Sequence, residues 1–424
     1  MINISIFNTF IFVIWLFLIW KFKKNNYALK FISIEFLFSA ITGIYFIQYG
    51  EREYYNLTFY GSLIFFIFFF ISVLPLFKTE IKSTQNIYIN EKSIKILCTI
   101  FFWGSILPFI NSIISLKFLL GGDIATLMKE FHDSRFYGTN QNSFNIISFF
   151  IDLSIKAAYY TKAFLPLFVI YLYNKYEKIN KYIWGIFLTQ ITLVLSSLIT
   201  SSRFLVVDFT LTYLFTYCLL YNKLKDTTKL FFKKLFKYGG CIIFIILFII
   251  TIGRAIAMGY TDITSILAWI SLYTGEGMLN FNEFTIHDTI RFGIEGVFPT
   301  LLNEKDYQQF LQYNADDYAK EWGWILGHEA NTFKSVYGDF VGSFGIGNSI
   351  IIFLIISFII IFFSKKLIQS FSGIALLITI FKYIYFGFLY FPYSGINGNN
   401  YLYQALLSII IIRAFEIYGK KTTL

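Results

Sequence analysis

The sequence predicts an all-α polytopic membrane protein of about 11 transmembrane helices (10–12), with one large extracytoplasmic loop between helices 8 and 9. Hydrophobic residues make up 57% of the 424 positions, whereas charged residues make up only 14%. The apolar residues also fall in runs near the length of about 20 residues that crosses a bilayer. A soluble domain would interrupt such runs with polar positions at helical or strand spacing. We therefore expect residues 1–424 to form a single integral membrane domain.

The first apolar run, Ile2 to Trp20, is expected to be a retained helix and not a signal peptide. No positive charge precedes it, and Lys21 follows it in place of a small-residue cleavage site. The predicted spans are residues 2–20, 31–49, 59–77, 96–116, 155–173, 182–200, 204–221, 235–253, 344–363, 372–391 and 402–417.

Lysine and arginine are concentrated in alternate loops, and this pattern sets the orientation because basic loops stay in the cytoplasm. The basic segments are residues 21–30, 78–95, 175–181, 223–237, 365–366 and 420–421. With an odd number of spans, the N-terminus lies outside and the C-terminus lies in the cytoplasm. The formal net charge of +10 then belongs to the cytoplasmic face, where it contacts membrane lipids. Nucleic-acid binding is therefore not expected.

Two predicted outer loops are long, residues 117–143 and residues 254–343, and they contain all three histidines. An enzyme on this side has no ATP or nucleotide sugars, so its substrate must already be activated, typically on a lipid phosphate. Arg203, Arg254 and Arg291 are the predicted pyrophosphate ligands, and Arg135 is a weaker candidate. A guanidinium offers planar donors that match phosphate oxygens. The alternative is that these arginines reach the lipid headgroups or pair with loop carboxylates.

The run from Trp322 to Gly342 holds the densest group of chemically capable residues. His328 or Glu329 is the predicted general base for an acceptor hydroxyl, because imidazole titrates near neutrality and a desolvated carboxylate approaches it. A surface histidine without catalytic function is the alternative, and Asp339 could instead cap the following helix. The residues predicted to bind the acceptor or organise this loop are Asn331, Thr332, Tyr337 and Asp339.

No metal or cofactor site is predicted. Cys98, Cys218 and Cys241 lack any CxxC spacing, and His328-Glu329 has Thr332 where a zinc-protease helix would carry its second histidine. No P-loop, dinucleotide fingerprint or nucleophile elbow occurs.

Charged residues also fall inside the apolar runs, where isolated charges are costly. We expect two structural pairs, Glu35 with Lys382 and Asp208 with Lys162, and a hydrated interior around them. A transporter would share this feature.

With these residues in place, the chain resembles the Wzy-type O-antigen and capsule repeat-unit polymerases. The likeness rests on the span count, the long outer loop, the turn Thr200 to Arg203, and Asn331-Thr332-Phe333 followed by Tyr337 to Phe340. The arginine motif of some members, with glycine eleven residues after the arginine, is not matched at Arg254, where Ser265 occupies that position.

The resemblance implies transfer of a growing glycan from undecaprenyl pyrophosphate to a sugar hydroxyl on another lipid-linked repeat unit. It also implies a flippase and a chain-length regulator as protein partners. An O-antigen ligase or another lipid-linked-sugar glycosyltransferase is the alternative, and a polysaccharide flippase or transporter is the less favoured one.

Overall fold

The computed structural model describes residues 2–50, 52–79, 81, 90–120, 146–199, 204–257, 262–303, 315–328 and 334–421. Within these residues the structure is all-helical and contains no strand, as predicted. Seven of the described helices are long and apolar enough to cross a membrane, or eight if one bent pair forms a single span. The described helices therefore fit a multi-pass membrane protein, and the count of eleven spans remains a prediction.

The eleven apolar runs fall largely on helices, with two corrections. The fifth predicted span, residues 155–173, is divided between α6 (Ile146–Thr161) and α7 (Leu165–Tyr176), which meet at a bend of 73°. The tenth, residues 372–391, is only partly helical because α15 (Phe371–Tyr385) ends in turns. Pro166 at the start of α7 lacks a backbone N–H and explains why the helix restarts there.

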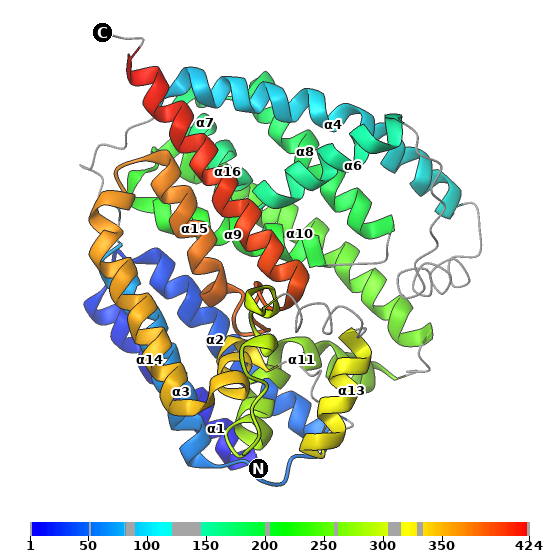
Figure 1. The fold of residues 1–424 in the computed structure, drawn as a ribbon, viewed down its shortest axis with the longest axis vertical. Helices are drawn as coiled ribbons and strands as arrows, with labels where there is room; N and C mark the ends of the chain where they lie inside the picture. Colours follow the sequence, from blue (N-terminus) through cyan, green and yellow to red (C-terminus); the bar gives the residue numbers. More distant parts are fainter. Residues whose placement is uncertain are drawn as a thin grey trace. The chain divides into compact units, whose positions relative to one another are not determined.

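The chain divides into two compact units (Figure 1). Unit 1 comprises Met1–Lys82, Thr251–Ile368 and Ile380–Tyr403, and unit 2 comprises Ser83–Ile250, Gln369–Thr379 and Gln404–Leu424. The elements wholly in unit 1 are α1 (Ile2–Phe22), α2 (Tyr27–Tyr49), α3 (Phe59–Val73), η1 (Leu74–Phe77), α11 (Ile263–Asn280), η3 (Phe281–Thr285), η4 (Ile294–Gly296), η5 (Pro299–Leu301), α13 (Ala315–Leu326) and α14 (Ser335–Leu367).

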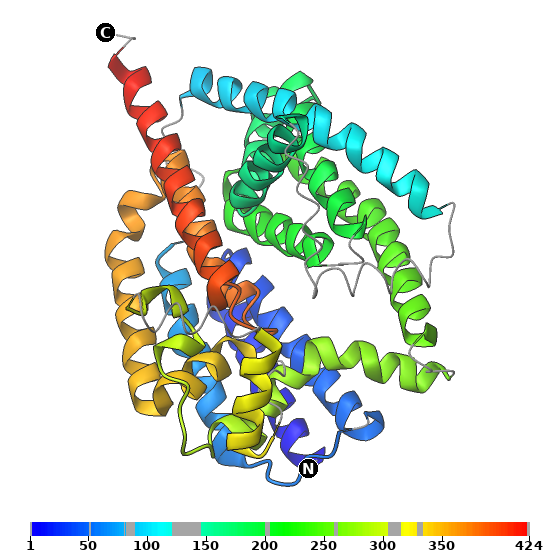
Figure 2. The same cartoon turned by 45° about the vertical axis from the view of Figure 1, so that its right-hand side comes forward.

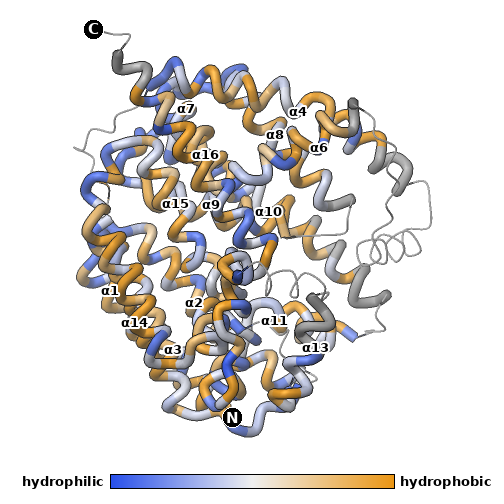
Figure 3. Tube along the Cα trace, viewed as in Figure 1, coloured by the Kyte–Doolittle hydropathy of each residue, from blue (hydrophilic) through white to orange (hydrophobic). Residues whose placement is uncertain are grey.

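Unit 1 is built around aromatic side chains from helices that are distant in sequence. Phe36 of α2, Phe68 of α3 and Tyr337 of α14 are fully buried. The ring of Phe68 stacks on that of Tyr337 at 5.7 Å, and Phe281 of η3 lies 6.1 Å from Phe68. Figure 3 shows how apolar residues follow α1, α3 and α14 along their lengths. The polar segment from η3 onward is therefore anchored directly in the apolar core.

Helix α14 is broken near its start, which separates a buried polar end from an apolar spanning part. Gly345 has φ of 79° and ψ of 168°, a conformation that only glycine adopts without strain. Residues 346–367 then form a helix of spanning length, and Lys365 and Lys366 lie in its last turn. The short part before Gly345 carries Tyr337 and Asp339.

Helix α11 packs closely against α2, although it lies inside the predicted outer loop (Figures 1 and 2). Ser39 Oγ donates a hydrogen bond of 2.6 Å to the carbonyl of Thr274. A Cβ added at Gly275 would lie 2.5 Å from the backbone nitrogen of Gly43. Small residues on both helices thus let the two backbones approach, as in membrane helix pairs.

We expect Gly275→Ala to destabilise the protein by about 1–3 kcal/mol, because the new methyl group overlaps the α2 backbone and forces the helices apart. The matched control is Gly240→Ala in α10, where an added Cβ meets nothing within 4 Å. Thermal unfolding of both variants in detergent measures the difference. Equal melting temperatures for the two variants would contradict the close approach.

Unit 2 is also helical. Its elements are α4 (Glu91–Leu120), α6, α7, α8 (Lys181–Ile199), α9 (Phe204–Leu220), η2 (Tyr221–Lys223), most of α10 (Asp226–Ala257), the start of α15 and the end of α16 (Gly395–Lys421). Hydrogen bonds between hydroxyl groups join α4 to α8. Ser105 Oγ donates to Thr189 Oγ1 at 2.8 Å, and the Oγ atoms of Ser112 and Ser196 are hydrogen-bonded at 3.1 Å. Such bonds satisfy polar groups in an apolar setting.

One of the two predicted intramembrane pairs is confirmed and the other is wrong. Lys162 Nζ lies 3.1 Å from Asp208 Oδ2, and both side chains are at most 3% exposed. The predicted Glu35–Lys382 pair is not formed, because both oxygens of the buried Glu35 carboxylate have no hydrogen-bond partner within the described residues. Lys382 Nζ lies instead 5.1 Å from the ring of Tyr401.

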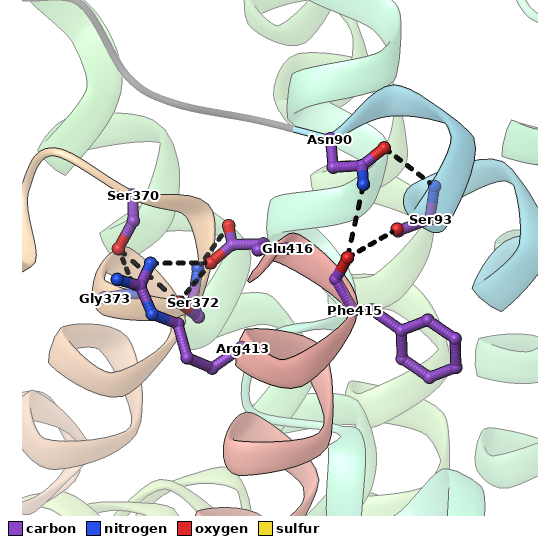
Figure 4. A network of polar contacts seen from close by, with 8 residues as sticks. All are labelled: Asn90, Ser93, Ser370, Ser372, Gly373, Arg413, Phe415 and Glu416. Atoms are coloured by element: carbon purple, nitrogen blue, oxygen red, sulfur yellow. Dashed lines mark hydrogen bonds and ion pairs between the residues drawn. The ribbon is translucent and has the colours of Figure 1, made fainter. Parts of the chain in front are cut away.

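The ends of α4, α15 and α16 in unit 2 are joined by a polar network (Figure 4). The Glu416 carboxylate, only 3% exposed, accepts hydrogen bonds from Ser372 N at 3.2 Å and Ser372 Oγ at 2.5 Å. It therefore caps α15 from a neighbouring helix. Arg413 donates to the same carboxylate at 3.2 Å, and Ser93 Oγ donates to the carbonyl of Phe415 at 3.0 Å.

Removing this cap by Glu416→Ala is expected to cost about 1–3 kcal/mol, because buried donors at the start of α15 lose their acceptor. Arg413→Ala should cost less than about 1 kcal/mol, since the Arg413 side chain is 48% exposed. Chemical unfolding of both variants in mixed micelles tests the order. A larger effect for Arg413→Ala would contradict the capping role.

Candidate functional site

The turn that follows α11 holds the segment 52–58 in place. One Glu283 oxygen accepts hydrogen bonds from the backbone N–H groups of Tyr55 and Asn56, both at 2.9 Å. Asn282 accepts from Thr58 N at 2.9 Å and donates to the carbonyl of Thr58 at 2.8 Å. Both side chains come from the π-helical turn η3, a geometry that is frequent at functional sites. The loop after α2 is therefore fixed by residues more than 200 positions away.

A histidine–carboxylate pair lies next to this turn. His328 Nε2 is 3.0 Å from Asp288 Oδ1, and the two side chains are 12% and 11% exposed. The imidazole ring stacks on Phe284 of η3 at a centroid distance of 4.4 Å. If Nε2 carries the proton that is donated to Asp288, Nδ1 is the basic nitrogen of the ring. The arrangement is that of a histidine base oriented by a carboxylate.

Two cations lie around the same carboxylate. Lys334 is 6% exposed, and its ammonium lies 4.5 Å from the centroid of the Phe292 ring. Burial lowers the pKa of Lys334, whereas the negative charges of Asp339 and Asp288 oppose that shift. Arg291 donates from Nη1 to the carbonyl of Thr285 at 3.2 Å. Burial lowers the pKa of Arg291 as well, whereas the negative charge of Asp288 raises it.

The start of α14 is fixed by the turns after α15, within unit 1. Ser335 N donates to the carbonyl of Leu389 at 3.1 Å, and Val336 N donates to that of Gly387 at 2.7 Å. Asp339 Oδ2 accepts from Phe391 N at 2.8 Å. Asp339 thus organises the turn after α15, and its charge also acts on Lys334.

The structure brings together three of the predicted site residues. His328 pairs with Asp288, and the negative charge of Asp288 also acts on Arg291. Asp339 and Asp288 both act electrostatically on Lys334. Tyr337 lies in the aromatic core of unit 1 instead, with 0% exposure. Arg254 lies on α10, and only its backbone is described. The predicted residues outside the described part are Arg203, Glu329, Asn331 and Thr332, together with the weaker candidate Arg135.

Asp288 and Lys334 are the residues that sequence reasoning missed. Asp288 is forty positions from His328, so no local pattern joins them. Lys334 lies at the end of the run that contains His328, and it is a basic residue in a predicted outer loop, which the positive-inside bias does not explain. That signal could have singled it out. No cluster of three or more potential metal ligands occurs among the described residues.

Comparison with known proteins gives no match to any family model, any curated protein or any solved structure.

The buried Glu283 carboxylate predicts a pH effect on stability. Burial raises its pKa above the usual 4.5, and the Asn56 backbone N–H opposes the shift. A raised pKa in the folded state means that stability is fully present below pH 4.5 and is lost as pH rises through the folded pKa. Glu283→Gln removes this loss, so the melting temperature of the variant relative to the parent should rise as the pH increases above 4.5. A difference that is constant with pH would contradict this.

Proposed function

We propose that this protein polymerises lipid-linked oligosaccharide repeat units on the outer side of a bacterial cytoplasmic membrane. It transfers a glycan from undecaprenyl pyrophosphate to a hydroxyl group of an acceptor sugar. The observation that carries the proposal is the His328–Asp288 pair, set beside Arg291 and the buried Lys334 in a predicted outer segment.

In this mechanism His328 is the general base. Nδ1 takes the proton of the acceptor hydroxyl while that oxygen bonds to the anomeric carbon of the donor glycan. Asp288, hydrogen-bonded to Nε2, fixes the ring and stabilises the imidazolium that forms. The bond between the anomeric carbon and the pyrophosphate oxygen breaks, and the lipid pyrophosphate leaves with the electron pair.

Two cationic side chains, Arg291 and Lys334, interact with the leaving group. Arg291 and Lys334 stabilise the charge that develops on the departing pyrophosphate, and a desolvated cation acts more strongly than one in water. Arg203 and Arg254 are proposed to contribute from the neighbouring predicted outer segments. Such a leaving group needs little protonation, so the paired carboxylates of a glycoside hydrolase are unnecessary.

The charge distribution of unit 1 supports the outer location. Asn26 Nδ2 donates to the carbonyl of Leu76 at 2.8 Å, and Lys23 lies over the ring of Phe77, so the basic ends of α1, α2 and η1 meet. Helix α2 has 23 residues and is about 34 Å long, and the segment 52–58 follows its opposite end. The site is thus about one bilayer core away from these lysines.

A polysaccharide transporter is the second candidate, and one observation favours it. Lys162 lies in the break between α6 and α7, and it pairs with Asp208 of α9, both side chains being buried. Interrupted helices with buried charges are typical of transporter substrate sites. A ligase would share the chemistry proposed above and transfer the glycan to lipid A core.

The test uses a strain in which the gene for this protein is deleted and a variant is expressed in its place. His328→Ala and Asp288→Asn should each leave mainly single-repeat surface glycan, because the acceptor hydroxyl is no longer deprotonated. Loss of the base is expected to reduce the transfer rate about 10²–10⁴-fold. Gel electrophoresis of the surface polysaccharide measures chain length, and immunoblotting confirms membrane insertion.

The matched control is His287→Ala, a histidine one position from Asp288 that is outside the proposed pair. Undiminished polymer length in inserted His328→Ala would overturn the assignment. Loss of all surface glycan in the deletion strain would favour the ligase or the transporter.

A further inference from the structure

One face of α10 in unit 2 is exposed over about four turns, and it changes from basic to apolar along the helix. Its basic part consists of three exposed lysines, Lys233, Lys234 and Lys237. The other exposed residues on this face are Leu230, Tyr238, Cys241, Ile242, Phe244 and Ile245. These positions recur at spacings of three and four, which place them on one side of an α-helix.

The opposite face of α10 packs inside unit 2. Phe232 is 0% exposed, and its ring lies 6.1 Å from that of Tyr173 in α7 and 5.9 Å from that of Tyr217 in α9. The ring of Phe236 lies 5.2 Å from that of Tyr217. These contacts fix the rotation of α10 about its axis, so the three lysines stay on the surface of unit 2.

The three lysines have no carboxylate partner within the described residues. The carboxylates at the start of α10 and at the end of α7 already pair with other lysines. Glu177 lies 2.5 Å from Lys225, and Asp226 lies 2.9 Å from Lys229. Three positive charges therefore remain available on this face.

We propose that these three lysines bind the headgroup of an anionic phospholipid, whose acyl chains pack on the apolar side chains that follow. Cys241 lies one turn, about 6 Å, beyond Lys237. This distance matches the depth of about 5–8 Å of one headgroup layer, so the ammonium groups and the apolar side chains meet the two parts of one lipid. Clusters of lysine beside a spanning helix attract anionic lipids in this way.

Two simpler explanations account for less of this surface. The positive-inside bias explains lysines at this end of the predicted span 235–253, but it requires neither a common face nor the absence of carboxylate partners. A free phosphate ion would use the lysines and leave the apolar side chains without a role. The site lies in unit 2, whereas the His328–Asp288 pair lies in unit 1, so its test is independent of the proposed function.

The test places a fluorophore on the same face of α10. Cys241 is exposed, whereas Cys98 is buried, so the full chain with Cys218→Ala carries one reactive cysteine. The chain is labelled at Cys241 and reconstituted in phosphatidylcholine vesicles. The probe is phosphatidylglycerol with a nitroxide near the top of its acyl chain, which quenches a nearby fluorophore. The reference is phosphatidylcholine labelled in the same way, at equal mole fraction.

We expect the anionic probe to quench the Cys241 fluorophore at least about threefold more strongly than the reference does, because the lysines enrich anionic lipid there. A variant without the three lysines should quench equally with both lipids. Its substitutions are Lys233→Gln, Lys234→Gln and Lys237→Gln.

The matched control removes three exposed lysines from unit 1 and should keep the preference of the parent. Its substitutions are Lys24→Gln, Lys365→Gln and Lys366→Gln. Equal quenching by both lipids in the parent, or the same loss of preference in both triple variants, would overturn the proposal. A preference that inorganic phosphate removes, but sodium chloride of the same ionic strength does not, would identify a phosphate-ion site instead and would also overturn it.

Discussion

The close approach of α2 and α11 is the constraint on which the rest of unit 1 depends. Gly43 and Gly275 let the two backbones meet, and Ser39 adds a hydrogen bond to the carbonyl of Thr274. Because α11 is held there, η3 directly after it reaches both the aromatic core and the segment 52–58. Asp288, Arg291, His328 and Lys334 themselves lie in the connecting segments, directly after or before helical elements that pack in unit 1.

The charges of the site are satisfied by one another. Asp288 pairs with His328, and its negative charge acts on Arg291 and Lys334. Asp339 accepts a hydrogen bond from the turn after α15, and its negative charge acts on Lys334 as well. A group of this kind sets two carboxylates, Asp288 and Asp339, against the side chains of Arg291, Lys334 and His328. Such a combination offsets desolvation, whose full cost falls on a buried charge without a partner. A substrate anion would enter a site in which the cations are already held in place.

Much of the fold could be predicted from the sequence. Runs of apolar residues located the helices, since a bilayer demands about 20 such residues whatever their partners. The bend between α6 and α7 was not predicted, because an apolar run has the same composition whether it is straight or broken. The Glu35–Lys382 pair was wrong for a related reason: sequence position along a helix does not decide which face meets which neighbour. The Lys162–Asp208 pair was found in spite of this limit.

The sequence by itself determined the all-helical, membrane-compatible architecture and the run that contains His328, because these depend on composition and local spacing. Only the tertiary structure decided that Asp288 contacts this histidine, that Lys334 is buried where the charge of Asp288 acts on it, and that α11 belongs to the helical packing of unit 1. These contacts join residues far apart in the chain. Their free energy comes from packing and desolvation in three dimensions, which no local pattern encodes.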